Sequence, residues 1–329
     1  MIKFLIIRLS SIGDIVLTTP VVRILATQLP DAEVHFFVKS QFVEILKNNP
    51  YIKKIHIYDG NIADNIRTFK QENFDYIIDL HKNLRTFRVR NSLSSLWFSF
   101  DKLNFEKWIL VNFKKNILPH KHIVERYLQV ISKFDVKYDG KGLDYFIAPD
   151  DEINIAERFG ELHKRGFVAI VIGAKHFTKQ IPIHKIISII KGISMPVILL
   201  GGKENKSAAD EIEKSTDSEM VKNSVGKLSL GQSASIVRQA KIVITPDTGL
   251  MHIAAAFGKK IVSLWGNTVP EFGMSPYLAH SDSKIFEVKD LSCRPCSKIG
   301  YNKCPKKHFR CMEDIEIKDV IDTVKKLWE

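Results

Sequence analysis

The sequence predicts two consecutive α/β domains, each built on a parallel β-sheet, and three observations carry this prediction. Short β-rich runs alternate with helical patterns in both halves of the chain, an order that favours parallel strands joined by helices on both faces. The length of 329 residues suits two domains of ordinary size. The stretch "KYDGKGLDYFIAPDDE" (137–152) has the glycines, proline and acids of a linker between the two halves.

The expected elements follow the chain in regular order. In the N-terminal half we expect strands at 3–8, 33–38, 53–59 and 75–80, and helices at 21–30, 42–49, 65–72 and 123–134. In the C-terminal half we expect strands at 167–174, 196–202 and 259–266, a strand–loop–helix unit at 241–258, and helices at 183–193, 205–215, 228–240 and 317–329.

The chain carries a large excess of positive charge. The 49 Lys and Arg against 37 Asp and Glu give a formal net charge of +12, which favours anionic partners: nucleic acid, phosphorylated small molecules or an acidic membrane surface. More than half of this excess lies in residues 82–126, where ten basic residues and three acidic ones are interleaved with aromatic residues. This segment fits either contact with anionic lipid or helices with charged outer faces and aromatic cores.

The sequence points to a cytoplasmic protein. No apolar run reaches the roughly 18 residues that a membrane span needs. The start, "MIKFLIIRLSS", does not fit a secretion signal because its apolar stretch is short and ends at Arg8.

The motif "VITPDTGLMHIAAA" offers a phosphate site. In open α/β sheets ligands bind at the carboxyl ends of the strands. Here a β-rich run ends at Thr245, and a helix of small residues begins near Leu250. The free backbone N–H groups of Thr248, Gly249 and Leu250 would point at an anion. The alternative is that Asp247 or Thr248 is a plain helix cap.

Two further strand ends carry residues that suit a nucleotide. Gly173 ends a strand and Lys179 follows six residues later, where it could neutralise a diphosphate or simply be solvated. Glu204 follows "LLGG" and could accept hydrogen bonds from ribose hydroxyls. Neither a P-loop motif nor G-x-G-x-x-G is present, which counts against a P-loop ATPase and a standard NAD dehydrogenase.

The first strand ends in "RLSSIGD", where Asp14 opens a helix. A carboxylate there would repel a pyrophosphate, so the phosphates are better held by the C-terminal domain. Asp14 is therefore either a helix cap or a group that faces a hydroxyl.

The four cysteines, at positions 293, 296, 304 and 311, form one short cluster with His308 nearby. They fit a zinc site of four thiolates, or of three thiolates and an imidazole, or else a compact loop of buried reduced thiols. We expect no disulfides in a reducing compartment.

The chain resembles glycosyltransferase family 9, the ADP-heptose:lipopolysaccharide heptosyltransferases, over nearly its whole length. The resemblance rests on "IIRLSSIGDIVLTTPVVRIL", "NPYIKKI", "DYIIDLHKNLRT", "HIVERYL", "GAKHFTKQIP", "LLGGKEN", "ITPDTGLMHIAAAFGKKIVSLWG" and the cysteine run. It implies the GT-B fold, in which two Rossmann-like domains with parallel sheets face each other across a cleft. The implied parts are an acceptor-binding domain at 1–145, a nucleotide-sugar-binding domain at 146–315, and a helix at 316–329 that packs back toward the first domain.

The resemblance also assigns roles. Asp14 matches the family's proposed general base. The residues that match the donor site are Gly173, Lys179, Glu204, Asp247, Thr248, Gly249 and His252. The residues expected on the acceptor side are Ser11, Gly13, Arg85, His122 and Arg126. Where the family often has Gln-Gly this chain has His81 and Lys82, where it often has tryptophan the chain has Ile181, and Ala174 and Lys175 replace common hydroxyl residues.

The implied reaction is an inverting transfer of heptose from ADP-heptose to the inner core of lipopolysaccharide. We expect no catalytic cofactor or metal, a lipid-linked anionic acceptor, peripheral contact with the cytoplasmic face of the inner membrane, no nucleic-acid partner, and a monomer. The alternatives are a relative that uses another nucleotide-sugar or acceptor, a non-catalytic nucleotide-sugar-binding module, and a nucleic-acid-binding protein that uses the basic segment.

Overall fold

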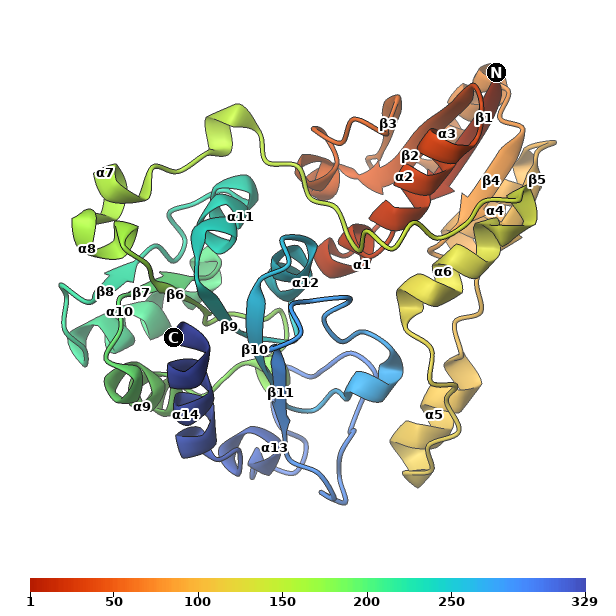
Figure 1. Ribbon diagram of the computed structural model, residues 1–329. Helices are drawn as coiled ribbons and strands as arrows, with labels where there is room; N and C mark the ends of the chain where they lie inside the picture. Colours follow the sequence, from red (N-terminus) through yellow and green to blue (C-terminus); the bar gives the residue numbers. More distant parts are fainter. The chain divides into compact units, whose positions relative to one another are not determined.

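The computed structural model describes residues 1–329, and the chain divides into two compact units. The first unit comprises residues 1–102 and 121–146, and the second comprises residues 103–120 and 147–329. Each unit contains one sheet, and all paired strands are parallel (Figure 1). The predicted α/β class is therefore confirmed.

The first unit has five strands in the order β3-β2-β1-β4-β5. The strands are β1 (Ile2–Ile7), β2 (Ala32–Lys39), β3 (Lys54–Tyr58), β4 (Tyr76–Asp79) and β5 (Leu96–Ser99). The helices are α1 (Ile12–Val16), α2 (Thr19–Gln28), α3 (Ile62–Glu72), α4 (Leu84–Ser92) and α6 (Ile123–Ile131), with short 3-10 helices at Ser40–Ile45 and Ser132–Phe134. Helix α2 packs against α6, and α3 packs against α4. Strand β1 is almost wholly apolar, and β2 buries five successive residues from Val34 to Val38, because helices cover both faces of the sheet.

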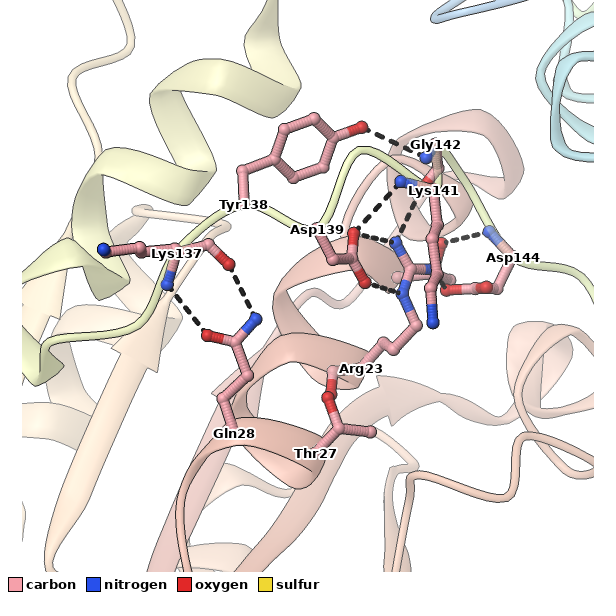
Figure 2. A network of polar contacts seen from close by, with 10 residues as sticks. Arg23, Thr27, Gln28, Lys137, Tyr138, Asp139, Lys141, Gly142 and Asp144 are labelled. Atoms are coloured by element: carbon pink, nitrogen blue, oxygen red, sulfur yellow. Dashed lines mark hydrogen bonds and ion pairs between the residues drawn. The ribbon is translucent and has the colours of Figure 1, made fainter.

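Residues 137–144, expected as part of a linker, are anchored to α2 (Figure 2). The buried guanidinium of Arg23 forms ion pairs with Asp139, Nε to Oδ2 at 2.7 Å, and with Asp144. The first half of the expected linker is therefore fixed to the first unit, which stops at Phe146.

The second unit has six strands in the order β11-β10-β9-β6-β7-β8. The strands are β6 (Val168–Val171), β7 (Val197–Leu200), β8 (Val221–Asn223), β9 (Ile242–Pro246), β10 (Lys260–Trp265) and β11 (Lys284–Glu287). The helices are α5 (Asn104–Phe113), α7 (Ile155–Phe159), α8 (Glu161–Lys164), α9 (Ile183–Ile193), α10 (Lys206–Lys214), α11 (Leu230–Gln239), α12 (Gly249–Ala256), α13 (Arg310–Glu313) and α14 (Ile317–Trp328). Short 3-10 helices lie at Pro149–Asp151, Phe177–Lys179, Lys203–Asn205 and Pro270–Phe272.

The C-terminal helix, expected to pack back toward the N-terminal domain, has its apolar partners in the second unit. Helix α14 belongs to the second unit and packs on α9. Its buried residues Val320, Val324 and Leu327 share one apolar core with α9 and with the strands of that sheet. This helix is strongly amphipathic, and its apolar side packs against the apolar residues of its own unit.

Residues 103–120 also differ from the expected domain boundary, because they belong to the second unit. Leu103, Leu110 and Leu118 pack with Val269 and Phe272 in a small core of their own. The basic segment 82–126 is thus divided between the two units.

Two sequence expectations fail locally. The helix expected at 42–49 is a 3-10 helix over Ser40–Ile45, because Pro50 disfavours helical geometry at Asn49 and the Asn49 side chain caps a turn by accepting from the N–H of Tyr51 at 3.0 Å. Strands β5, β8 and β11 were not expected; each has three or four residues and retains partly exposed side chains, unlike the equally short but buried β6 and β7. No helix combines the length and the apolar character that crossing a bilayer requires.

Candidate functional site

Asp14 sits in the first turn of α1, just beyond the end of β1. Its Oδ1 lies 2.5 Å from Nη2 of Arg8, and its Oδ2 accepts hydrogen bonds from the Ser11 hydroxyl at 2.7 Å and the Ser11 N–H at 3.2 Å. Asp14 is therefore a helix-capping residue, and the Arg8 ion pair is an interaction that capping does not require.

Arg8 is held as firmly as the carboxylate it contacts. Its Nη1 donates to the carbonyl of Leu80 at 2.5 Å and to the Tyr127 hydroxyl at 3.0 Å, and its Nε donates to the carbonyl of Ser10 at 2.8 Å. These partners come from the ends of β1 and β4 and from α6, so three elements converge on one guanidinium. Sequence reasoning assigned no role to this arginine because it is the last residue of the expected first strand, at 3–8.

The electrostatics of this cluster keep Asp14 ionised. Burial alone would raise the pKa of the Asp14 carboxyl, but the Arg8 charge and the Ser11 hydrogen bonds outweigh it, so the pKa lies below its ordinary value. Burial raises the pKa of the Tyr127 hydroxyl to about 12, which keeps it protonated. The cluster thus offers a carboxylate that accepts hydrogen bonds at any physiological pH.

The loop after β4 adds a neutral imidazole. The buried Asp79 carboxylate accepts from the N–H groups of His81 at 3.0 Å and Lys82 at 2.7 Å, which shapes the turn. Burial and the charges of Arg8 and Lys102 lower the pKa of His81 to about 3. The Nδ1 atom of His81 is buried and has no hydrogen-bond partner in the protein. The His-Lys departure from the family pattern therefore lies in the same electrostatic cluster as Asp14.

The remaining acceptor-side residues are spread over the first unit. Gly13 is buried in α1. Arg85 is exposed on α4, with its guanidinium 5.9 Å from the centre of the Tyr58 ring. His122 caps α6, its Nδ1 accepting from the backbone at 3.2 Å. Arg126 is buried on α6, burial lowers its pKa, and it donates to a backbone carbonyl at 3.3 Å. The structure brings Ser11, Arg8 and Asp14 together, whereas Arg85 makes a surface contact.

In the second unit, Asp247 follows β9 and binds two side chains through one oxygen. Its Oδ2 lies 2.5 Å from Nζ of Lys179 and accepts from the Thr268 hydroxyl at 2.9 Å. Lys179 comes from the loop after β6 and Thr268 from the loop after β10, so three strand ends meet here. Sequence reasoning missed Thr268, although it too directly follows a predicted strand.

The start of α12 leaves its N–H groups available to a ligand. Thr248 is the N-cap, but its side chain makes no capping hydrogen bond, and its hydroxyl lies 3.2 Å from that of Thr245. Gly249 is the first helical residue, and His252 is buried one turn later. The helix N-terminus therefore has an anion-binding character that no side chain of the cap neutralises.

Gly173 and Glu204 flank the start of the next helix. A Cβ atom at Gly173 would lie 2.0 Å from the side-chain oxygen of Asn205, so only glycine fits there. The Oδ1 atom of Asn205 is buried and has no hydrogen-bond partner in the protein. The Glu204 carboxylate is exposed and folds over Gly202. The carboxylate is thus free to accept hydrogen bonds at the carboxyl ends of β6 and β7.

The four cysteines converge around one small cavity, which His308, Arg294 and Thr178 also line. The Sγ of Cys293 lies 3.8 Å from Nε2 of His308. Burial and the neighbouring thiol of Cys296 raise the pKa of Cys311 to about 12, and burial with Cys293 and Cys304 raises that of Cys296. The cysteines thus line one cavity, but their sulfur atoms do not form a group that lies within 4.8 Å of one another.

A second group with metal-ligand chemistry lies in the first unit, where atoms of His35, His56 and Glu72 are all within 4.8 Å of one another. His35 and His56 already share a hydrogen bond of 2.9 Å, and Glu72 pairs with Lys54 at 2.5 Å. These contacts satisfy the three side chains without an ion.

The comparisons with known proteins agree with one another. Residues 62–306 match the sequence profile described as "Glycosyltransferase family 9 (heptosyltransferase)". The chain is similar to lipopolysaccharide heptosyltransferase 1 of Campylobacter coli, with 27% identity over an alignment of 348 positions that spans 99% of each chain.

Two solved structures share the fold over almost the full length. The glycosyl transferase family 9 structure from Veillonella parvula DSM 2008 matches with a TM-score of 0.80 and 20% identity, covering 99% of this chain and 96% of its own. The E. coli ADP-heptose lps heptosyltransferase II structure matches with a TM-score of 0.76 and 19% identity, covering 99% and 98%. The predicted GT-B fold is confirmed.

Proposed function

Because the chain belongs to glycosyltransferase family 9, the heptosyltransferase family, we propose that it transfers a heptose from ADP-heptose to the inner core of lipopolysaccharide. The names of its relatives support both substrates, since one is a lipopolysaccharide heptosyltransferase and another is named for ADP-heptose. The observation that carries the proposal is the Lys179–Asp247–Thr268 cluster beside the uncapped start of α12, which suits an anionic leaving group.

The second unit would bind the donor. The N–H groups at the start of α12 would stabilise the diphosphate as its bond to the sugar breaks. The Lys179 ammonium would bind the diphosphate equally in the donor and in the ADP product, so it would contribute mainly to affinity. Glu204 would accept hydrogen bonds from the ribose hydroxyls, and Gly173 would let the nucleotide approach the backbone. His252 would support the helix that carries the N–H groups, because it is buried within α12.

Asp14 would act as the general base. It would take the proton of the acceptor hydroxyl while that oxygen attacks the anomeric carbon on the side opposite the departing diphosphate, so the configuration inverts. The Oδ1 atom keeps a lone pair beyond its bond to Arg8, whereas Oδ2 already accepts two hydrogen bonds from Ser11, so Oδ1 would receive the hydroxyl proton. The lowered pKa keeps Asp14 ionised and also makes it a modest base, so this step would depend on close positioning.

The acceptor would be an anionic, lipid-linked saccharide held by the first unit. Arg126, His122 and the backbone around Ser11 and Gly13 would contact it, and Arg85 would add positive charge at the surface. We expect the protein to act as a monomer at the cytoplasmic face of the inner membrane.

Helix α5 supports contact with the membrane surface. Its buried side, through Leu110, packs on the second unit, while Phe105, Trp108 and Phe113 are exposed at 65%, 49% and 67%. Phe105 and Trp108 stack with ring centres 6.3 Å apart, and lysines flank the helix at both ends. An aromatic face among lysines suits the headgroup region of an anionic leaflet.

We also propose a structural zinc ion for the cysteine cluster, whose thiols would have to move closer together to bind it. Four thiols and one imidazole line a cavity, and together they could supply the tetrahedral sulfur-rich set that zinc prefers. Zinc there would cross-link the segment that holds Cys293, Cys296, Cys304 and Cys311. Metal analysis of the purified protein should then find about one zinc per chain, and its absence with unchanged thermal stability would leave the cluster as packed thiols.

The function is tested by mass spectrometry of the products formed from purified protein, ADP-heptose and defined lipid A–core acceptors. The proposal predicts a product heavier by one heptose, released together with ADP. Transfer from a different nucleotide-sugar would overturn the proposed donor. Binding of ADP-heptose without transfer would instead make the protein a nucleotide-sugar-binding module. In a separate assay, vesicles with acidic lipid should bind the protein at low salt, and binding should fall when Trp108 is changed to Ser.

A further inference from the structure

The segment that carries the cysteines also packs on the loops that build the Lys179–Asp247–Thr268 cluster. We propose that this segment positions the cluster, and that Arg294 is the residue through which it holds Thr268. The inference rests on the proposed donor-binding function and adds to it a positioning residue outside the donor site.

Arg294 makes a set of contacts that only a guanidinium can make. Its Nε donates to the carbonyl of Gly266 at 2.6 Å and its Nη2 to the carbonyl of Thr268 at 2.8 Å. The same Nη2 pairs with Glu287 at 2.7 Å, and Nη1 donates to the carbonyl of Val288 at 3.2 Å. The side chain is only 7% exposed. The planar guanidinium thus joins the loop after β10 to the carboxyl end of β11 through several N–H donors.

Thr268 carries this restraint to the donor site. Its backbone carbonyl is held by Arg294, and its hydroxyl donates to Oδ2 of Asp247 at 2.9 Å. That carboxylate oxygen is also the one that lies 2.5 Å from Nζ of Lys179. If Thr268 moves, Asp247 loses one of its two partners, and the place of the Lys179 ammonium becomes less defined.

The same segment holds the Lys179 loop directly. The N–H of Thr178 donates to the carbonyl of Tyr301 at 3.1 Å, and the N–H of Tyr301 donates to the Thr178 hydroxyl at 2.8 Å. Thr178 immediately precedes Lys179 in the chain, so this pair fixes the backbone from which the lysine extends.

The loops also approach more closely than side chains would allow. A Cβ atom on Gly266 would lie 2.5 Å from the carbonyl oxygen of Thr178. A Cβ atom on Gly300, whose φ of +130° itself favours glycine, would lie 2.7 Å from Cβ of His176. The loop after β6, the loop after β10 and the cysteine segment therefore pack backbone to backbone behind the cluster.

The test replaces the guanidinium and measures binding of ADP alone. Arg294→Lys keeps the charge and removes the fork, and we expect it to weaken ADP binding by about tenfold or more because the cluster is displaced. The Michaelis constant for the donor should rise in parallel, while that for the acceptor stays unchanged. Arg310→Lys is the matched control, because Arg310 lies in the same segment and its Nε pairs with Asp314 at 2.7 Å in an exposed ion pair. It should leave ADP affinity unchanged.

A double variant tests the route through Thr268. Thr268→Val removes the hydroxyl that Asp247 accepts from. If Arg294 acts through Thr268, adding Arg294→Lys to Thr268→Val should weaken ADP binding little further, whereas independent effects would multiply. A multiplied loss would overturn the proposed route.

Two other results separate the possible failures. If Arg294→Lys lowers the melting temperature but leaves ADP affinity intact, the arginine only stabilises the fold and the inference is wrong. Lys179→Met reports on the proposed function itself: if it does not weaken ADP binding, the donor assignment fails. If Lys179→Met weakens binding and Arg294→Lys does not, only the positioning role fails.

Discussion

The two units each place one aspartate just beyond the carboxyl end of an inner strand, and each aspartate lies 2.5 Å from a cation. Asp14 follows β1 and pairs with Arg8, while Asp247 follows β9 and pairs with Lys179. The partners differ in how they are held. Arg8 has three further hydrogen bonds to the protein, whereas Asp247 is the partner that holds the Lys179 ammonium.

The Arg8–Asp14 and Lys179–Asp247 pairs therefore suit different chemistry. An arginine fixed by several acceptors is a permanent charge that keeps its carboxylate ionised and in place. A lysine on a flexible stem is a point charge that can turn toward a phosphate and leave its carboxylate to the Thr268 hydroxyl. The same carboxylate–cation distance of 2.5 Å therefore suits a proton acceptor in one unit and an anion site in the other.

The largest effect should come from Asp14→Asn. The amide can still cap α1 but cannot take a proton, so turnover should fall by about 10²–10⁴. ADP affinity should be unchanged, as measured by calorimetry. The variant leaves the Arg8 charge without its partner, so its melting temperature is recorded to separate lost chemistry from lost folding. Turnover near that of the original protein would remove Asp14 from the mechanism.

Acid should destabilise the first unit independently of that chemistry. Burial and His35 lower the pKa of His56 to about 4 in the folded protein. A base whose pKa is lowered by folding contributes its full stability above about pH 6.5, and this is lost as the pH falls toward 4. We expect a loss of about 2–3 kcal/mol in the free energy of unfolding between pH 7 and pH 4, measured by denaturant titration.

A variant identifies the group responsible for this loss. His56→Gln keeps a donor for the 2.9 Å bond to His35 and does not titrate, so it should flatten the pH dependence. An unchanged slope in the variant would assign acid sensitivity to other groups.

Lys179→Met should weaken ADP binding by about 10- to 100-fold, because a charge-assisted hydrogen bond is worth about 1.5–3 kcal/mol. Single-turnover rates at saturating donor should change less. The matched control is Lys164→Met, which removes another lysine paired with an acid, at 3.5 Å from Glu161 on an exposed helix. Equal losses in the two variants would mean that general charge, not this lysine, binds ADP.

The sequence predicted the strand ends and so found Asp14, Lys179 and Asp247, because ligands gather at one edge of a parallel sheet and that edge is visible in the order of the elements. It did not predict the Arg8–Asp14 pair, since an arginine at the end of an apolar run looks like part of the strand. The partners of Arg8 from β4 and α6 meet it only through the fold.

The segment 103–120 shows another limit of sequence reasoning. Its position between elements of the first unit predicted membership of that domain, yet Leu110 packs with Phe272 in the second unit. Chain order does not reveal which apolar face a helix finds when two units are available.

The smallest effect should be a shift in pH dependence. Burial acts to raise the pKa of Asp14, and Arg8 is the strongest of the effects that lower it. Arg8→Lys should weaken the attraction between this cation and the Asp14 carboxylate, so the pKa of Asp14 should rise. The acid limb of the kcat/KM profile should then move to higher pH, on the order of one unit. A uniform fall in rate with no movement of the limb would mean that Arg8 acts only on folding.

The most direct test of the account measures two quantities in the same two variants: the ADP dissociation constant and the single-turnover rate at saturating ADP-heptose. Asp14→Asn should lose rate and keep ADP affinity, while Lys179→Met should lose ADP affinity and keep most of the rate. That crossed pattern would assign proton transfer to the first unit and donor binding to the second. If both variants lose the same quantity to a similar extent, the division of labour between the two units is contradicted.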